Sequence, residues 1–276
     1  MKSDPSVFMA LKVFIGITMN LTVMVGCLLT NSSIAQSIGL LNESIVIVNP
    51  SEKKSKESEP LIIRKCDDFT LTGKGNNPEW NKAEWTRLTK LDEGGREYES
   101  KFKVLYSATG IYLHFYGQDD KITTKDYNDF ENIFNGDVFE VFFHTNPAVM
   151  VYFEYEVNQM DKELILTISN LDGQSYTSWA PRQRAGKNQS GIKKMVDVIG
   201  GEKEVNGTIR SWSAEIFFPY GALGLLPNVP PKSGSYWNAN FCRLDYDTGK
   251  MVKWSWTPTI ENSFHELDKF LSIKFE

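Results

Sequence analysis

Tryptophan and hydrogen-bonding side chains occur close together between residues 236 and 270. Trp254 and Trp256 flank a serine in one strand-like segment, and Arg243 lies in the segment before it. Flat indole rings can pack on the apolar faces of a sugar ring, while a guanidinium group donates hydrogen bonds to hydroxyls at its rim. This combination predicts a saccharide-binding surface. The alternative is that the tryptophans fill the core of a β domain.

Charged and amide side chains also recur on strand-like segments, opposite stripes of apolar residues. The set comprises Glu140, Glu154, Glu156, Asn158, Glu215 and Arg243. Because side chains alternate between the two faces of a strand, these groups are expected to form a polar sheet face or a shallow groove. The alternative is an ordinary solvated face whose cross-strand Glu–Arg pairs contribute little to stability.

Paired carboxylates suggest a second chemistry. Most glycoside hydrolases hold two carboxylates about 5–10 Å apart around the bond that they cleave. The candidates for such a pair are Glu140, Glu154, Glu156 and Glu215. No segment carries a His-Glu-x-x-His, Gly-x-Ser-x-Gly or phosphate-loop pattern. The three histidines are too scattered to suggest a zinc site, and His265 is expected to fix the last loop by a hydrogen bond.

An acidic loop, KDYNDFENIFNGD, offers oxygen ligands for a metal ion. Its candidate ligands are Asp126, Asn128, Asp129 and Asp137. Ca²⁺ prefers carboxylate and carbonyl oxygens, although this loop lacks the spacing of an EF-hand. The alternative is that these side chains are solvated or cap the loop. A structural Ca²⁺ is therefore the one cofactor considered, and no organic cofactor is expected.

The elements that must position these residues are β-strands. Apolar residues recur with period two in segments near 102–106, 111–116, 138–143, 151–157, 164–168 and 211–218. Short strands at this spacing, separated by Gly, Asn and Asp turns, predict an all-β antiparallel sandwich. Helix is expected only in short turns, such as the one after Pro219.

The N-terminal 60 residues differ in composition from the rest. A lysine-flanked apolar run over residues 13–29 is followed by Ser33 and Ala35 at the −3 and −1 positions of a cleavage site, which predicts a signal peptide over residues 1–35. The alternative is a lipoprotein signal that anchors the chain at Cys27. Residues 36–60 end in SEKKSKESEP and are expected to be a flexible linker before a domain over 61–276. The expected location is secreted or periplasmic, or the outer membrane for a lipoprotein.

The overall charge argues against one class of partner. The net charge is −5, and no stripe of Lys and Arg is present to bind a phosphate backbone, so nucleic acid is excluded as a partner. No membrane contact is expected unless Cys27 carries a lipid. After signal removal two cysteines remain, Cys66 and Cys242, which form either a disulfide or two buried apolar side chains.

The order of several motifs resembles a known family. The chain reads PEWNKAEW, GIYLHFYGQDD, NGDVFEVFF, YFEYEVN, SWSAEIFFPYGAL and WNANFCRLD, followed by a closing tryptophan, proline and Phe-His. Together they resemble the family 9 carbohydrate-binding modules of the DOMON-like superfamily, in their exported stand-alone form. The resemblance implies a calcium-stabilised, jelly-roll-like sandwich that binds saccharide through aromatic platforms and polar strand residues.

The resemblance also implies site residues. The polar positions that match the family pattern are Asp137, Glu140, Asn158, Glu215 and Arg243, and the candidate sugar platforms are Trp179, Trp254 and Trp256. The other tryptophans in the pattern, Trp80, Trp85 and Trp212, lie where core residues are expected.

Three functions follow, in order of preference. The first is a non-catalytic saccharide-binding protein, the second a glycoside hydrolase built on a Glu pair, and the third a surface interaction protein. The first two predict different surroundings for the glutamates, namely an open aromatic-edged groove for the binding protein and a pocket with paired carboxylates for the hydrolase.

Overall fold

The structure is a computed structural model. It describes residues 59–173, 177–181, 191–258, 260–261 and 263–276, and these described residues belong to one compact unit. The expected signal peptide, Cys27 and nearly all of the expected linker lie outside the described residues. Within the described residues no helix is both long and apolar enough to cross a membrane.

Nearly all regular structure in the described residues is strand. The strands are β1 (Leu61–Lys65), β2 (Thr86–Arg87), β3 (Thr89–Lys90), β4 (Ser100–Tyr106), β5 (Gly110–Gln118), β6 (Val138–His144), β7 (Val151–Val157), β8 (Glu163–Ser169), β9 (Ser178–Pro181), β10 (Lys193–Ile199), β11 (Ser211–Pro219), β12 (Tyr236–Asp245), β13 (Val252–Ser255) and β14 (Leu271–Phe275). Single 3₁₀ turns occur at η1 (Pro78–Lys82), η2 (Ile133–Asn135), η3 (Tyr220–Ala222) and η4 (Leu267–Lys269). The turn expected after Pro219 is η3, so the all-β prediction with short helical turns is confirmed.

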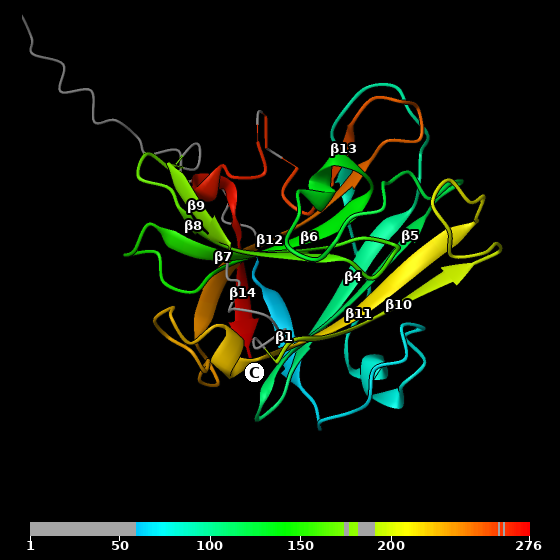
Figure 1. Ribbon diagram of the computed structural model, residues 1–276. Coiled ribbons are helices and arrows are strands. Elements are labelled where there is room, and N and C mark those ends of the chain that lie inside the picture. Colours follow the sequence, from blue (N-terminus) through cyan, green and yellow to red (C-terminus); the bar gives the residue numbers. More distant parts are fainter. Residues whose placement is uncertain (1–58, 174–176, 182–190, 259, 262) are drawn as a thin grey trace, which may run out of the picture. The chain divides into compact units, whose positions relative to one another are not determined.

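The strands form two layers joined by one shared strand (Figure 1). The first sheet has the order β14-β12-β6-β7-β8-β9, and the second has the order β4-β5-β11-β10. Strand β1 pairs with β14 through its first half and with β4 through its second half. Both pairings of β1 are parallel, unlike the antiparallel pairs elsewhere, and the long connection from β1 to β4 allows this. The sandwich is therefore a single sheet that curls over on itself.

Aromatic rings fill the space between the layers. Phe139 stacks on Trp212 with 4.1 Å between ring centroids, and Phe102 stacks on Phe241 at 4.0 Å. These residues come from the apolar parity of β6, β11, β4 and β12, which is the parity that the alternating pattern assigned to the interior. Stacked and edge-on aromatic pairs add to the stabilisation that area burial alone provides.

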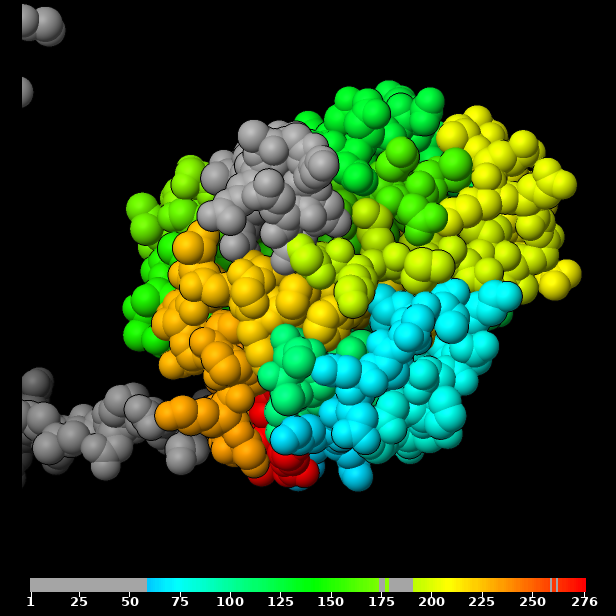
Figure 2. Space-filling view, turned by 60° about the horizontal axis from the view of Figure 1, so that its bottom comes forward, coloured from blue at the N-terminus to red at the C-terminus, as the bar shows by residue number. Residues whose placement is uncertain are grey.

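Each sheet is also covered on its outer face. The residues before β2 pack Trp80 and Leu71 onto Tyr112 and Phe217 of the second sheet. Figure 2 shows part of this cover, in cyan, beside the yellow residues near position 200. On the first sheet, the segment before β14 packs Phe264 and Phe270 onto Phe142, Tyr152 and their neighbours. The outer face of the first sheet is thus a second interior, and a cavity lies there.

Candidate functional site

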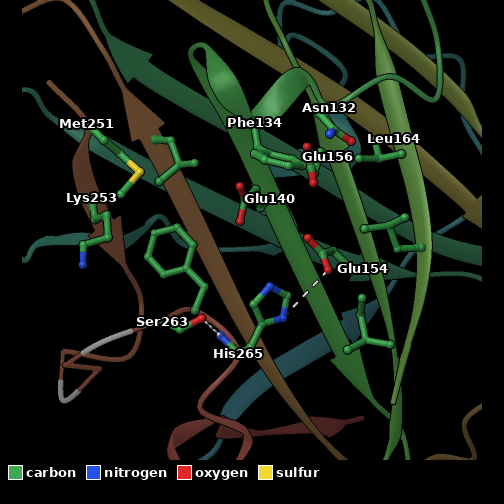
Figure 3. Close-up of a pocket in the computed structure, with 14 residues that line it drawn as sticks. Asn132, Phe134, Glu140, Glu154, Glu156, Leu164, Met251, Lys253, Ser263 and His265 are labelled. Atoms are coloured by element: carbon green, nitrogen blue, oxygen red, sulfur yellow. Dashed lines mark hydrogen bonds and ion pairs between the residues drawn. The ribbon is translucent and has the colours of Figure 1, made fainter. Parts of the chain in front are cut away.

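A cavity of about 410 Å³ lies on the outer face of the first sheet, below the segment that precedes β14 (Figure 3). Its floor carries three carboxyl groups, from Glu140 on β6 and from Glu154 and Glu156 on β7. Its remaining lining residues are Asn132, Phe134, Leu164, Leu166, Ile168, Leu244, Met251, Lys253, Ser263, Phe264 and His265. We call this cavity the glutamate pocket.

Strand register brings the three glutamates together. Glu140 lies opposite Glu156 in the antiparallel β6–β7 pair, and Glu154 lies opposite Phe142. Directly opposed residues share a sheet face, as do residues two positions apart on one strand. The three side chains therefore project from one face, and Figure 3 shows their carboxyl groups pointing into the pocket.

The three carboxyl groups are almost completely buried. Their residues are 4%, 3% and 1% exposed for Glu140, Glu154 and Glu156. Burial raises the pKa of Glu154 to about 8, and it raises the pKa of Glu140 and Glu156 well above the ordinary value. Repulsion from neighbouring carboxylates adds to the increase for Glu140 and Glu156. At neutral pH the pocket is therefore expected to hold protonated glutamic acids.

Cations near the pocket do not offset this burial. His265 Nδ1 lies 4.0 Å from Glu154 Oε2, but burial lowers the pKa of His265 to about 4, so the imidazole is neutral at pH 7. Lys253 also lines the pocket, but its ammonium is paired with Asp92, with 3.7 Å between Nζ and Oδ1. Two carboxylate oxygens, Glu154 Oε2 and Glu156 Oε2, are buried and have no hydrogen-bond partner among the described residues.

The loop over the pocket is held by specific contacts. The hydroxyl of Tyr152 and His265 Nδ1 share a hydrogen bond of 2.7 Å, and Asn170 Nδ2 donates to the backbone oxygen of His265 at 2.7 Å. The expectation that His265 fixes the last loop is therefore confirmed. These contacts fix the position of the loop beside the carboxyl groups.

Arg243 was expected to contact ligand, but the structure places it inside the protein. It is 0% exposed, and its guanidinium bonds Asp119 Oδ2 at 3.1 Å and Asp245 Oδ2 at 2.6 Å. It also donates to Ser100 Oγ at 3.1 Å and to the backbone oxygen of Gln118 at 2.6 Å. The prediction failed because Arg243 shares the parity of the core-facing residue opposite it, Phe139, rather than that of Glu140. Its role is to join the two sheets.

The tryptophans named as platforms do not line the glutamate pocket. Trp254 is 1% exposed, and its ring lies 5.2 Å from the Arg243 guanidinium, so it has no free face for a sugar. Trp256 is half-buried on Phe102 and Phe241 and lines a separate hollow beside β1. Trp179 pairs through its backbone with Ile168, a pocket residue, but its side chain lies outside the described residues.

Two further predicted residues serve the fold. Glu215 lies on the second sheet, 0% exposed, and accepts hydrogen bonds from the backbone N–H of Thr72 and Gly73 and from Trp80 Nε1. Asn158 follows β7 and accepts two backbone hydrogen bonds in the turn to β8, from Met160 and Lys162. Glu215 therefore anchors the cover of the second sheet, and Asn158 shapes a turn, so neither reaches the pocket.

The acidic loop does not gather its predicted calcium ligands. Asp129 accepts from the backbone N–H of Glu163, Asn128 donates to Glu131, and Asp126 is exposed. Asp137 is buried elsewhere and accepts from the backbone N–H of Thr123 and of Tyr246. In the described part of the chain, the only three acidic residues with ligand oxygens within 4.8 Å of one another are Asp119, Asp245 and Asp247.

This aspartate cluster already has its counter-charge and donors. Arg243 binds Asp119 and Asp245, and all six carboxylate oxygens of the three aspartates accept hydrogen bonds. A guanidinium cation at this position repels a second cation. The residues therefore do not fit a calcium ion here, and calcium binding at the loop residues stays a prediction.

The two cysteines are free and buried. Cys66 packs under the cover of the second sheet, and Cys242 packs on the pocket face of the first. The cysteines are therefore two separate buried side chains and do not form a disulfide.

Sequence reasoning missed the aromatic walls of the pocket. Phe134 lies in η2 of the acidic loop, and Phe264 lies in the segment before β14. Neither segment alternates like a strand, so parity assigned no face to them. The remaining signal was weak, since each is a large apolar residue in a segment rich in polar side chains. Trp85, in contrast, looked like a core residue but is 36% exposed beside Lys101 and Lys103.

Comparison with known families bears on this arrangement. Residues 71–201 match the model of the carbohydrate family 9 binding domain-like family, and this stretch contains all three pocket glutamates. Residues 71–201 are therefore similar to a family 9 carbohydrate-binding-like domain. The predicted resemblance is thereby confirmed over the strands that form the pocket floor. No curated protein sequence matches the chain.

Solved structures share the fold of the family 9-like domain. A Bacteroides uniformis protein assigned to carbohydrate binding superposes with a TM-score of 0.63 at 16% identity, covering 79% of this chain and 99% of that one. A family 9 module from Caldicellulosiruptor kristjanssonii in complex with glucose gives 0.50 at 14% identity, covering 78% and 95%. The same organism's module with cellotriose gives 0.50 at 13%, covering 79% and 93%. At these identities the similarity establishes a common β-sandwich.

Proposed function

We propose that the protein is a non-catalytic carbohydrate-binding protein and that the saccharide binds in the glutamate pocket. One observation carries the proposal: a cavity of about 410 Å³ holds three buried carboxyl groups between apolar walls, within the stretch that matches the family 9-like model. Its fold neighbours include modules solved with glucose and with cellotriose. Concave sites with a few convergent polar groups are typical of small-ligand binding.

The pocket has the two kinds of surface that a sugar needs. Phe134 and Phe264 supply apolar area for the C–H face of a ring. A protonated glutamic acid donates one hydrogen bond and accepts others, so each of the three can bond a hydroxyl group. Oxygens left without partners in the free protein favour ligands that supply those partners, because a ligand lacking them leaves buried polar groups unsatisfied.

A glycoside hydrolase is the second candidate, because the glutamates lie in a pocket rather than on an open groove. A retaining or inverting mechanism requires one protonated and one ionised carboxyl group. Such pairs arise where the surroundings push two pKa values apart. Here burial raises the pKa of all three glutamates in the same direction, and none has a cationic partner in the described residues. This favours binding over catalysis.

Export and calcium binding belong to the same proposal. The lysine-flanked apolar run and the Ser33-x-Ala35 site support a mature protein that starts at Gln36, secreted or periplasmic, with a lipid at Cys27 as the alternative. The oxygen-rich sequence of the loop supports a structural Ca²⁺ at Asp126, Asn128, Asp129 and Asp137. Such a site would require these side chains to move together, because Asp137 is hydrogen-bonded to Thr123 and Tyr246 and Asp129 to Glu163. The mass of the protein recovered from its host distinguishes the two N-termini.

Replacing Phe134 by alanine is expected to weaken saccharide binding about 5- to 150-fold. This corresponds to about 1–3 kcal/mol, the scale measured for an aromatic side chain that stacks on a planar ring. Phe134 lines the pocket but is only half-buried, so the fold should tolerate the change. A glycan array identifies the best ligand, and calorimetric titration measures the affinity of both proteins.

Trp85→Ala is the matched control, because Trp85 is the exposed aromatic residue on the opposite sheet. Its affinity for the same ligand should equal that of the wild type. If Trp85→Ala lost binding and Phe134→Ala kept it, the saccharide site would lie on the second sheet.

A further inference from the structure

We propose that the preferred ligand of the glutamate pocket is an amino sugar, a saccharide whose ring carries a free ammonium group. The inference rests on the proposed function, since it names the class of saccharide that this pocket selects. It starts from the charge of the groups that face the cavity.

The elements around the glutamates bring no cation into contact with them. Strand β12 contributes Cys242, and Tyr246 comes directly after the end of this strand; neither side chain is a cation. Strand β7 adds Tyr152, whose hydroxyl bonds the neutral His265. Strand β13 adds Lys253, whose ammonium approaches Asp92 instead. Three carboxyl groups thus share one cavity with no positive partner among the described side chains.

Two oxygens in this cluster are ready to accept hydrogen bonds. Glu154 Oε2 and Glu156 Oε2 are buried without a hydrogen-bond partner, on side chains more than nine-tenths buried. A buried polar atom without a partner costs about 1–3 kcal/mol, and charged groups cost more. A ligand ammonium with three N–H donors would satisfy both oxygens and would pair with a carboxylate in the cavity once one glutamic acid has lost its proton.

A bare metal ion suits this pocket less well than an organic cation. No group of three acidic residues that includes these glutamates brings its oxygens within 4.8 Å of one another in the described residues. Calcium requires six to eight oxygens at about 2.3–2.6 Å. The cavity is instead wide and has apolar walls from Phe134, Phe264 and Leu166, which suit a ring that carries the charge. The geometry therefore fits a cationic sugar.

Binding of an ammonium also accounts for the protons of the pocket. Burial raises the pKa of Glu154 to about 8, so near pH 7 the free pocket holds its proton. When a sugar binds as the ammonium, the carboxyl group ionises and its proton passes to the buffer. The ammonium–carboxylate pair then replaces a protonated acid, and the total number of protons is conserved. A neutral sugar releases no proton.

The test compares three trimers with the same β-1,4-linked glucose-type backbone: cellotriose, the glucosamine trimer with free amines, and the N-acetylglucosamine trimer. Calorimetric titration of the full-length protein at pH 6.5, in two buffers of different ionisation enthalpy, gives both affinity and proton release. We expect the free-amine trimer to bind at least tenfold more tightly than either neutral trimer, with proton release on binding of the amine alone.

Glu154→Gln removes one carboxyl group and keeps its shape. It should lower the affinity for the free-amine trimer at least tenfold and reduce proton release, whereas the exposed control Glu202→Gln should change neither. Circular dichroism confirms that each variant is folded.

Three results would overturn the inference. The first is a neutral trimer that binds as tightly as the amine, and the second is an amine preference that survives Glu154→Gln, which would assign it to the acidic surface. The third is no binding of any trimer. In the third case, a glycan-array signal for another saccharide leaves the proposed function intact, and an array without signal overturns both.

Discussion

Arg243→Met should destabilise the protein by about 3–5 kcal/mol and leave its saccharide affinity unchanged. Removing one partner of a buried ion pair leaves the other charge buried and uncompensated, at this cost. Arg243 is 0% exposed and binds two buried aspartates, Asp119 and Asp245. It also ties β12 of one layer to Ser100 and Gln118 of the other. For a domain of this size the loss corresponds to a fall in melting temperature of roughly 6–20 °C.

Thermal denaturation followed by circular dichroism checks this expectation. Arg87→Met is the matched control, because the Arg87 side chain is 74% exposed in its pair with Glu99. Exposed pairs contribute at most about 1 kcal/mol, so the control should melt close to the wild type. If Arg243→Met instead kept its melting temperature and lost saccharide affinity, Arg243 would be a ligand contact.

The second large effect is a dependence of stability on pH. Burial raises the pKa of Glu154 from 4.5 to about 8, and the pKa of Glu140 and Glu156 rises in the same direction. The folded protein therefore binds these protons more tightly than the unfolded chain does. Their contribution to stability is fully present below pH 4.5 and is lost as the pH rises towards 8. For Glu154 alone the loss is about 5 kcal/mol, at 1.36 kcal/mol per pKa unit.

Other groups titrate in the same range, so a difference measurement isolates the pocket. The pKa of His114 and of His265 is lowered to about 4, and these side chains destabilise the fold as the pH falls below 6.5. Burial raises the pKa of Asp119 to about 7. Its titration therefore lowers stability as the pH rises, as that of Glu154 does. Comparing wild type with Glu154→Gln cancels these contributions. Urea denaturation from pH 4.5 to pH 8 should show the variant gaining stability relative to wild type as the pH rises. A constant difference would mean that Glu154 titrates normally in the folded state.

The part of the fold that the sequence predicted follows from local periodicity. Alternation in β6 and β7 put Glu140, Glu154 and Glu156 on one face, and antiparallel pairing placed them side by side. This step needs only the parity of each strand. The prediction that they line a shallow open groove is wrong, because that face is covered by the acidic loop and by described residues of the segment before β14, such as Phe264 and Phe270.

The errors come from contacts that parity does not report. Arg243 carries a charged side chain of a kind that usually lies at the surface, yet it is buried in the interior beside Trp254. Arg243 can be buried because it donates hydrogen bonds to Asp119 and Ser100, which lie in distant segments of the chain. Sequence separations of more than 100 residues put such partners beyond any local pattern. Phe134 was missed for the same reason, since its face is set by the loop's tertiary packing.

The most direct test of the central claim is to fill the glutamate pocket. Leu166 lines the pocket from β8, and the next residue, Thr167, points to the other face of the same strand. Calorimetric titration compares wild type, Leu166→Trp and Thr167→Trp, using the saccharide that gives the strongest glycan-array signal. The account predicts that Leu166→Trp, still folded by circular dichroism, loses binding at least 100-fold while Thr167→Trp binds like the wild type. Equal binding by the folded Leu166→Trp protein would place the saccharide site outside this pocket and contradict the account.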